Sequence, residues 1–507
     1  DEFGGDFGTR LSDQPEVEAR LRTTIARAYL SLGLGAAARQ QVDAALALRR
    51  AAAEPDPVAI ADLLDLHAWC AHEEAQYEDA EREYRELLAE RLRLTGPTDE
   101  GVARAQFCLG DVLKHRGDVA GAEELARASL DTWHALGLDD DKERLPALNL
   151  LGQLLEERGA HAEAKQRIGE ALELSVRLTG ERNKNSATLV NNLGSICHAL
   201  GQFDEAATHF ERALALYREL VHGDHPEIAR TLNNLGEVRR NQGRAAEAIE
   251  LLRESHAMRE RILPPGHPDT AQTLNNLALA LYAAGKLDDA IECMRKAVAV
   301  RRAATGGDPK LSLAIANLAS LLRTRGDVDE AVELCREALA LDEARLPSEH
   351  VDLSFTLLAY GRTLREKGSL DEAVAMLRRA LDIRTKVLGE KYAKVAECQM
   401  HLGATLRAKK DFAAAEPLLR ASATSIAAQL GAAHATAAAA RAELGNCLRE
   451  LARYDEAEVE LLAAHQALAG RYGAADAKTK AAARHLAALY AAQSRSADAE
   501  RWSAAAR

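Results

Sequence analysis

One block of sequence recurs about every 42 residues along this chain, and that period limits what the chain can fold into. Its clearest copy, residues 225–261, reads HPEIARTLNNLGEVRRNQGRAAEAIELLRESHAMRER. Each copy contains two amphipathic stretches of helical period, separated by a tight turn. One such helix pair cannot cover its own apolar face, so the copies must stack on one another. The period therefore predicts an all-α superhelical solenoid of helix-turn-helix repeats.

The turn between the two helical stretches gives each repeat an anchor position. Steps of 42 residues, with a one-residue deletion before the eighth turn, place the turns at Gly33, Ala75, Gly117, Gly159, Gly201, Gly243, Gly285, Gly326, Gly368, Lys410, Ala452 and Ser494. We predict that these twelve repeats form a single solenoid over residues 15–507. Residues 1–14 are expected to be an irregular N-terminal extension.

Small residues recur at two fixed places in every repeat. The fifth residue after each anchor is always Ala, and the seventh residue before it is always Gly or Ala. This pattern predicts that the two helices of a repeat cross closely there, because larger side chains would overpack the crossing at about 1–3 kcal/mol. In the sixth repeat we expect a helix from Pro226 to about Asn241, followed by a helix that buries a stripe including Ala248, Ile249 and Leu252.

Composition excludes several classes of protein. The 65 basic and 78 acidic residues give a net charge of −13, which argues against a general nucleic-acid partner. No apolar run is long enough to cross a membrane. The seven cysteines are scattered without a Cys-x-x-Cys spacing and are expected to be buried thiols, which weakly favours the cytoplasm. The chain begins at Asp1 and ends part-way through a second helix, so we expect it to be a piece of a longer protein, exported only if that protein has an upstream membrane segment.

The pattern Leu235-Gly236, Ala248, Leu252 is similar to the tetratricopeptide repeat. The 42-residue period, with HPEIARTLNNLG and HPDTAQTLNNLA, resembles the kinesin light chain variety of that repeat. The usual Trp of the first helix is replaced, for example by Val190 or Leu232. The opening DQPEVEARLRTTIARAYLSLGL also resembles repeat arrays attached to bacterial serine/threonine kinases, although the chain carries no kinase motif. The resemblance implies that first helices line a concave groove.

Asparagines form two rows on the first helices. Ten or nine residues before an anchor stand Asn149, Asn191, Asn192, Asn233, Asn234, Asn275, Asn276 and Asn317. An amide offers both a donor and an acceptor, so such rows can pair with the backbone of an extended peptide. In the resembling family these asparagines hold cargo peptides. The alternative is that they bind the neighbouring repeat and keep the stack in register.

A row of cations lies three residues before the anchors. Its members are Lys114, Arg240, Arg323, Arg365, Arg407 and Arg449, interrupted by Tyr282. Guanidinium groups donate in pairs to carboxylates, so the row predicts a groove for an acidic segment. The alternative is that these side chains are solvated or paired with acids such as Glu366 and Glu450.

We find no catalytic, metal or cofactor motif. His222, Asp224 and His225 lie at an expected helix start, where Asp and His serve as caps. Residues 139–141 lack the Gly and Glu of a calcium loop, and Cys197 with His198 is not a nucleophile pair because helix neighbours point apart. Two hypotheses remain: a non-catalytic scaffold for a protein or peptide ligand, or a regulatory, sensor or oligomerisation region of a larger bacterial signalling protein. The oligomeric state is not predicted.

Overall fold

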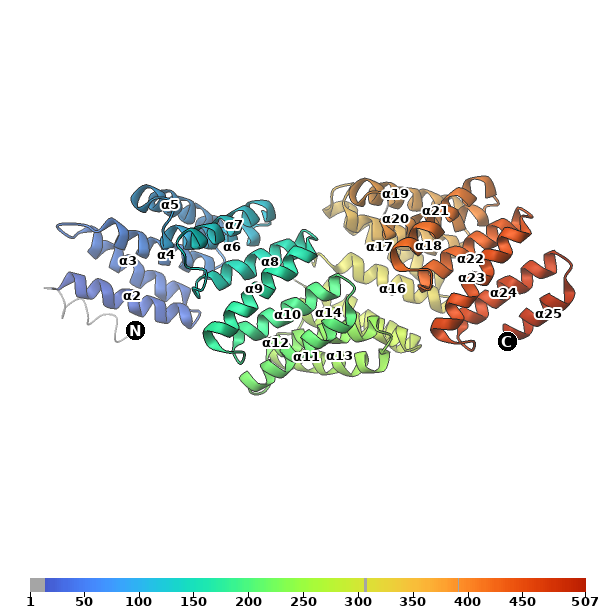
Figure 1. Cartoon of the computed structure of the whole chain (residues 1–507), viewed down its shortest axis with the longest axis horizontal. Helices are drawn as coiled ribbons and strands as arrows, with labels where there is room; N and C mark the ends of the chain where they lie inside the picture. The colour runs from blue at the N-terminus through green and yellow to red at the C-terminus, as the bar shows by residue number, and fades with distance from the viewer. Residues whose placement is uncertain (1–13, 305–307, 391) are drawn as a thin grey trace. The chain divides into compact units, whose positions relative to one another are not determined.

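The computed structural model describes residues 14–304, 308–390 and 392–507, which form 24 helices and no strand (Figure 1). The all-α repeat fold predicted from the period is confirmed. The chain groups into two compact units, which we call unit 1 (up to Met258) and unit 2 (from Arg259), and we describe each by itself. The extension predicted for residues 1–14 lies outside the described residues except for Gln14.

The helices alternate between the first helix of a repeat, helix A, and the second, helix B. The first six repeats contain α2 (Pro15–Ser31), α3 (Gly35–Arg50), α4 (Pro57–Glu73), α5 (Tyr77–Thr95), α6 (Glu100–His115), α7 (Val119–Ala135), α8 (Arg144–Glu157), α9 (His161–Thr179), α10 (Lys184–Ala199), α11 (Phe203–Leu220), α12 (Pro226–Asn241) and α13 (Ala245–Ile262). Even-numbered helices are helices A. The predicted bounds of the helix that starts at Pro226 are those observed for α12.

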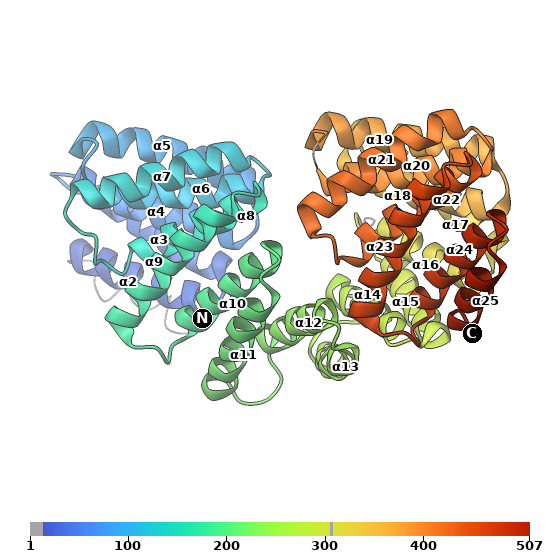
Figure 2. The same cartoon turned by 45° about the vertical axis from the view of Figure 1, so that its right-hand side comes forward.

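The last six repeats contain α14 (Pro268–Ala283), α15 (Leu287–Arg302), α16 (Leu311–Arg325), α17 (Val328–Arg345), α18 (Val351–Lys367), α19 (Leu370–Leu388), α20 (Ala393–Ala408), α21 (Phe412–Leu430), α22 (Ala435–Glu450), α23 (Tyr454–Tyr472), α24 (Ala477–Ala492) and α25 (Ser496–Ala505). The boundary between the units falls within α13. Figure 2 shows the helices of unit 2 stacked in successive pairs. Among the described residues, no helix is apolar over a length sufficient to cross a bilayer.

A left-handed residue ends every helix A. All twelve anchor positions have positive φ, between 56° and 105°. After α12, the Gly243 amide donates to the Arg240 carbonyl at 3.0 Å and the Arg244 amide to the Arg239 carbonyl at 2.8 Å. These bonds satisfy carbonyls that the helix end leaves open. Four anchors adopt this conformation without being glycine, at a cost of about 1–2 kcal/mol each: Ala75, Lys410, Ala452 and Ser494.

The two helices of a repeat cross at the small residues that the sequence repeats. A Cβ atom added to Gly236 would lie 2.7 Å from Cγ of Leu252, and one added to Gly361 would lie 2.6 Å from Cγ of Leu377. Helix B therefore sits directly on the backbone of helix A. The predicted small pairs are buried in every repeat except the last, where Ala487 and Ala499 are half-buried. Some repeats have Ala instead of Gly in helix A at the crossing. In three of them the helix B residue that corresponds to Leu252 is Val42, Met294 or Cys335.

Helix A begins with a side-chain cap in most repeats. The Nδ1 atom of His225 accepts from the Glu227 amide at 3.2 Å, as expected for a cap. His267, His350 and His434 cap their helices in the same way. All seven cysteines are buried thiols, as predicted.

Candidate functional site

One face of helix A remains partly open on each stack. Within each unit, consecutive helices A contact one another, for example α4 and α6 in unit 1 and α16 and α18 in unit 2. The positions 13, 10, 6 and 3 residues before the anchor, and likewise 13, 9 and 6, are three or four residues apart, so that all five positions lie on one broad stripe of helix A, about 120° wide. We call this stripe, taken over the helices A of one unit, the inner face of that unit.

The asparagine rows lie on the inner face at different depths. Asn191 and Asn233 are almost fully buried, and Asn192 and Asn276 retain 8% of their exposure. Four others are half-buried and within reach of a ligand: Asn149, Asn234, Asn275 and Asn317. In the row ten residues before the anchor, Asn149 and Asn275 are thus half-buried, whereas Asn191 and Asn233 are covered. Asn191 is covered by the next helix A, α12, whose Thr231 hydroxyl bonds to it.

Several of these amides join neighbouring repeats. Nδ2 of Asn192 donates to Oδ1 of Asn149 at 2.9 Å, and Nδ2 of Asn317 donates to Oδ1 of Asn275 at 3.0 Å. Oδ1 of Asn191 accepts from the Thr231 hydroxyl at 3.1 Å. These bonds match the alternative in which asparagines hold the stack in register. A ligand could form hydrogen bonds only with the donors and acceptors of these asparagines that such bonds do not already occupy.

The cation row is half-buried and has partners on the protein. Arg323 lies 3.2 Å and Arg365 4.0 Å from the same oxygen of Glu366. The other members contact Gln153 (Lys114), Glu237 (Arg240), Glu443 (Arg407) and Glu450 (Arg449). Without a ligand, these arginines therefore form ion pairs within the protein, as in the alternative given above. An acidic ligand would have to compete with Glu366, Glu443 and Glu450 for them. Tyr282, which interrupts the row, is 45% exposed.

A cation that the sequence argument missed lies between two members of this row. Arg362, six residues before Gly368, is half-buried on α18, and no carboxylate among the described residues is within ion-pair distance of it. Its Nε atom is shielded from solvent without a hydrogen bond. Burial and the guanidinium groups of Arg323 and Arg365 lower the pKa of Arg362. The like charges of these arginines repel one another, and a bound anion would reduce that repulsion.

His401 of α20 belongs to the same positive region. Burial, followed by the charges of Arg362 and Arg365, lowers the pKa of His401 well below its ordinary value, so the imidazole is neutral at pH 7. The acid Glu397 lies nearby but makes an ion pair of 3.2 Å with the fully buried Arg384. We define Arg323, Arg362, Arg365 and His401 as the cationic centre of unit 2.

A cavity adjoins the cationic centre. It has a volume of about 470 Å³ and lies between α18, α20, α22 and α24. Arg362, His401, Lys478 and His485 contribute its basic wall, and Glu397 and Glu443 its acidic groups. Much of the remaining lining consists of alanine side chains, which leave room for a side chain of a ligand.

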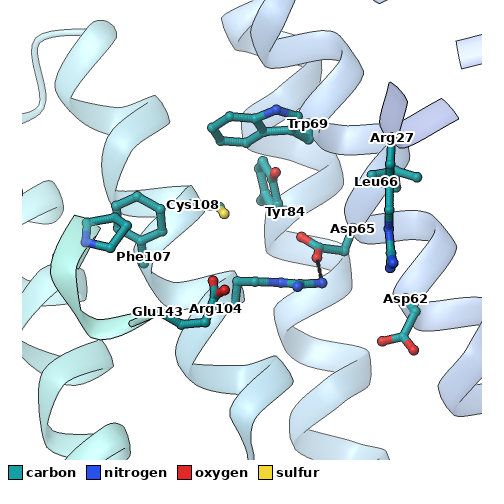
Figure 3. Close-up of a pocket in the computed structure, with 11 residues that line it drawn as sticks. Arg27, Asp62, Asp65, Leu66, Trp69, Tyr84, Arg104, Phe107, Cys108 and Glu143 are labelled. Carbon is teal, nitrogen blue, oxygen red and sulfur yellow. Dashed lines mark hydrogen bonds and ion pairs between the residues drawn. The ribbon is translucent and has the colours of Figure 1, made fainter. Parts of the chain in front are cut away.

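A second cavity, of about 330 Å³, lies on the inner face of unit 1 (Figure 3). Trp69, Tyr84 and Phe107 supply aromatic walls, and Arg104 reaches across to the carboxylate of Asp65, with which it forms an ion pair. Burial raises the pKa of Asp65, although Arg104 opposes that effect. Because Asp65 is already paired with Arg104, we expect this cavity to attract a charged ligand less strongly than the cationic centre does.

Sequence signals for these missed residues exist but are weak. Arg362, Trp69 and Arg27 all stand six residues before their anchors, a position that shares the face of the two rows. That position holds different residue types in different repeats, so no single residue type recurs there often enough to be noticed in the sequence. His401 shows no signal, because its environment comes from arginines of neighbouring helices.

Comparison with known proteins agrees with this architecture. A family model described as "Tetratricopeptide repeat" matches residues 101–176, 185–261, 227–303, 311–386 and 360–427, and a second model of the same description matches residues 275–345. Together these matches cover more than half of the chain. None of the curated proteins gave a match to this sequence.

The fold is shared with a solved structure, RapI, and two further solved structures are similar to parts of the chain. The apo form of RapI is 13% identical, with a TM-score of 0.57 over 73% of this chain and 98% of RapI. A putative kinesin light chain from Podosopora anserina with nearly identical TPR-like repeats is 25% identical, covers 40% of this chain and 97% of its own, and has a TM-score of 0.36. BtubC (BKLC) from P. vanneervenii is 23% identical, covers 54% of this chain and 92% of its own, and has a TM-score of 0.34.

The resemblance to kinase-attached arrays is not addressed by these comparisons and stays a prediction. The repeat period, the left-handed turns, the small residues at each crossing and the matched family models lead to one assignment. This chain belongs to the tetratricopeptide repeat family.

Proposed function

We propose that this chain is a non-catalytic scaffold that binds an extended acidic peptide along its inner face, with the strongest contacts at the cationic centre of unit 2. The observation that carries the proposal is Arg362, a half-buried guanidinium group without a carboxylate partner among the described residues. Tetratricopeptide repeat proteins bind protein partners, which makes a peptide the natural source of the missing anion.

The arrangement of charges favours an acidic side chain at this point. Arg323 and Arg365 share Glu366, whereas Glu397, the other carboxylate near Arg362, forms an ion pair with Arg384. An incoming carboxylate can therefore pair with Arg362 without breaking an ion pair that already exists. A charge-assisted bond to a partly buried arginine is stronger than one formed in open water, because solvent screens it less.

The polar groups beside the cationic centre suit the backbone of the same peptide. Asn275 and Asn317 are half-buried and bonded to each other, and Nδ2 of Asn275 also donates to Oδ1 of Asn276 at 3.3 Å. A second amide hydrogen of Asn275 and the side-chain oxygen of Asn317 are left as a further donor and acceptor. Tyr282 offers an exposed ring and hydroxyl group on the same face. In unit 1 we assign the corresponding peptide contacts to Asn149, Asn234 and Arg240.

A charge reversal tests the proposal. The triple variant Arg323→Glu, Arg365→Glu and Arg407→Glu changes the inner face of unit 2. A matched triple, Arg336→Glu, Arg379→Glu and Arg420→Glu, makes the same change in net charge on the helices B α17, α19 and α21. Binding of a fluorescent glutamate-rich peptide to the full chain is measured by anisotropy at low and at physiological salt.

We expect the inner-face triple to weaken binding by about 100-fold or more, since three lost charge pairs amount to roughly 3 kcal/mol or more. The helix B triple should change affinity by less than about threefold at physiological salt, where distant exposed charges are screened. Circular dichroism should show little change in helicity for either variant. Equal affinity of the wild type and the inner-face triple would show that the peptide binds elsewhere.

A further inference from the structure

Two histidines and an aspartate meet at the ends of two consecutive helices A in unit 1. His72 lies in the last turn of α4, whereas Asp111 and His115 lie one turn apart on α6. One ligand atom from each residue lies within 4.8 Å of the other two. This cluster plays no part in the proposed peptide contacts.

The nitrogens of His72 lack an adequate partner on the protein. Both ring nitrogens are shielded from solvent, and neither makes a well-aligned hydrogen bond. Nε2 lies 3.1 Å from Oδ2 of Asp111, so the two groups touch, but their alignment is poor for a hydrogen bond. Buried polar atoms of this kind normally have a hydrogen-bond partner, so these two nitrogens indicate a position where a ligand could bind.

Both imidazole rings pack on aromatic side chains. Trp69 stacks on His72 with the ring centres 4.8 Å apart and the planes at 17°. Tyr77 stacks on His115 at 4.8 Å and 3°, and it meets His72 edge-on. The shielded His72 ring therefore loses little freedom when it binds an ion, which favours binding, whereas the exposed His115 ring can still shift along Tyr77.

We propose that His72, Asp111 and His115 bind one divalent transition-metal ion of the zinc type. Two imidazoles and a carboxylate suit Zn²⁺, Ni²⁺ and Cu²⁺, and they leave at least one coordination position for water or for a group from a partner. Metal–ligand bonds of about 2.0–2.2 Å imply donor atoms roughly 3.4 Å apart in a tetrahedral site. The cluster must therefore contract, and the exposed His115 is the residue best placed to move.

The charges around the cluster are compatible with a cation. Asp111 supplies a carboxylate oxygen 3.1 Å from Nε2 of His72, so an anionic ligand already faces the imidazole. Lys114 does not occupy the site, because its ammonium group bonds to Gln153 on the next helix A.

A second cluster in unit 1, formed by Cys197, Glu205 and His209, lacks this compatibility. Lys165 donates to both oxygens of Glu205 at 2.8 Å and places a cation where the metal would bind. Burial raises the pKa of Cys197, so its sulfur is a protonated thiol at neutral pH. This cluster serves as an internal comparison for the test.

The test uses the full chain, stripped with a chelator and titrated with ZnCl₂ by calorimetry. Ni²⁺ is titrated in parallel with tryptophan fluorescence as the readout, because Trp69 contacts His72. The variants are His72→Gln and the surface variant His115→Gln, with His134→Gln as the matched control. His134 is an exposed histidine that pairs with Asp139 outside the cluster.

We expect one zinc ion per chain, with affinity reduced about 100-fold in His72→Gln and in His115→Gln and unchanged in His134→Gln. Trp69→Phe should retain zinc binding and lose most of the quenching by Ni²⁺. Circular dichroism of each variant shows whether it is folded, and His115→Gln keeps the test valid if His72→Gln is not. The proposal is overturned if the wild type binds no zinc, if His115→Gln binds zinc as the wild type does, or if Cys197→Ala alone abolishes binding.

Discussion

The close crossing of the two helices in each repeat predicts opposite effects for the same substitution at two glycines of unit 1. Gly236 lies where α12 meets α13, and a Cβ atom there would be 2.7 Å from Cγ and 3.1 Å from Cδ2 of Leu252. Gly169 lies inside α9, and a Cβ atom there would have no neighbour within 4 Å. Both glycines are replaced by alanine in separate variants.

The magnitudes follow from two effects. Alanine in a helix interior is more favourable than glycine by about 1 kcal/mol, and this gain applies to both sites. At Gly236 the contact with Leu252 adds an overpacking cost of about 1–3 kcal/mol. Gly169→Ala should therefore raise the free energy of unfolding by about 1 kcal/mol, whereas Gly236→Ala should lower it by up to about 2 kcal/mol. The difference between the two variants measures the overpacking alone.

Urea unfolding followed by circular dichroism gives the overall effect. Native-state amide exchange shows whether the loss is confined to α12, α13 and their neighbours, as expected for a repeat array. Adding Leu252→Val to Gly236→Ala recreates the Ala–Val pairing of the first repeat and should recover part of the loss. The crossing argument is refuted if Gly236→Ala stabilises the chain as much as Gly169→Ala does.

Two further predictions concern unit 2. Arg384 is fully buried and donates to Ser354 at 3.0 Å and to the Lys394 carbonyl at 2.8 Å, so Arg384→Met should cost about 3 kcal/mol in urea unfolding. The exposed Arg379→Met should cost less than about 1 kcal/mol, and equal losses would contradict the argument. The lowered pKa of His401, which faces Arg323, Arg362, Arg365 and Arg384, stabilises the fold above the ordinary value of 6.5 and loses that contribution as the pH falls below it. The wild type should therefore lose more stability than His401→Gln between pH 7.5 and pH 5, and parallel pH profiles would refute this.

Most of the fold could be predicted from local sequence. The anchors, the small residues and the ends of α12 each depend on contacts within one repeat, and 42-residue spacing makes such contacts visible. Even the non-glycine anchors Lys410 and Ser494 were placed correctly by register, because the next helix requires a left-handed turn there.

The candidate sites were only partly predictable because they depend on contacts between repeats. The asparagine and arginine rows were visible, but the burial of Asn191 and the shared partner of Arg323 and Arg365 follow from how helices A stack. Arg362 belongs to no row. His72 and His115 lie on different helices, so only the spacing of Asp111 and His115 on one helix face could have indicated the cluster.

The central claim is that an acidic peptide binds at the cationic centre of unit 2. Its most direct test is photocrosslinking of the full chain to a glutamate-rich peptide that carries a photoreactive residue, followed by mass spectrometry of the adducts. The account predicts adducts on α16, α18 and α20 that disappear when an excess of unlabelled peptide is added. Adducts mainly on the helices B α17, α19 and α21, or mainly in unit 1, would contradict it.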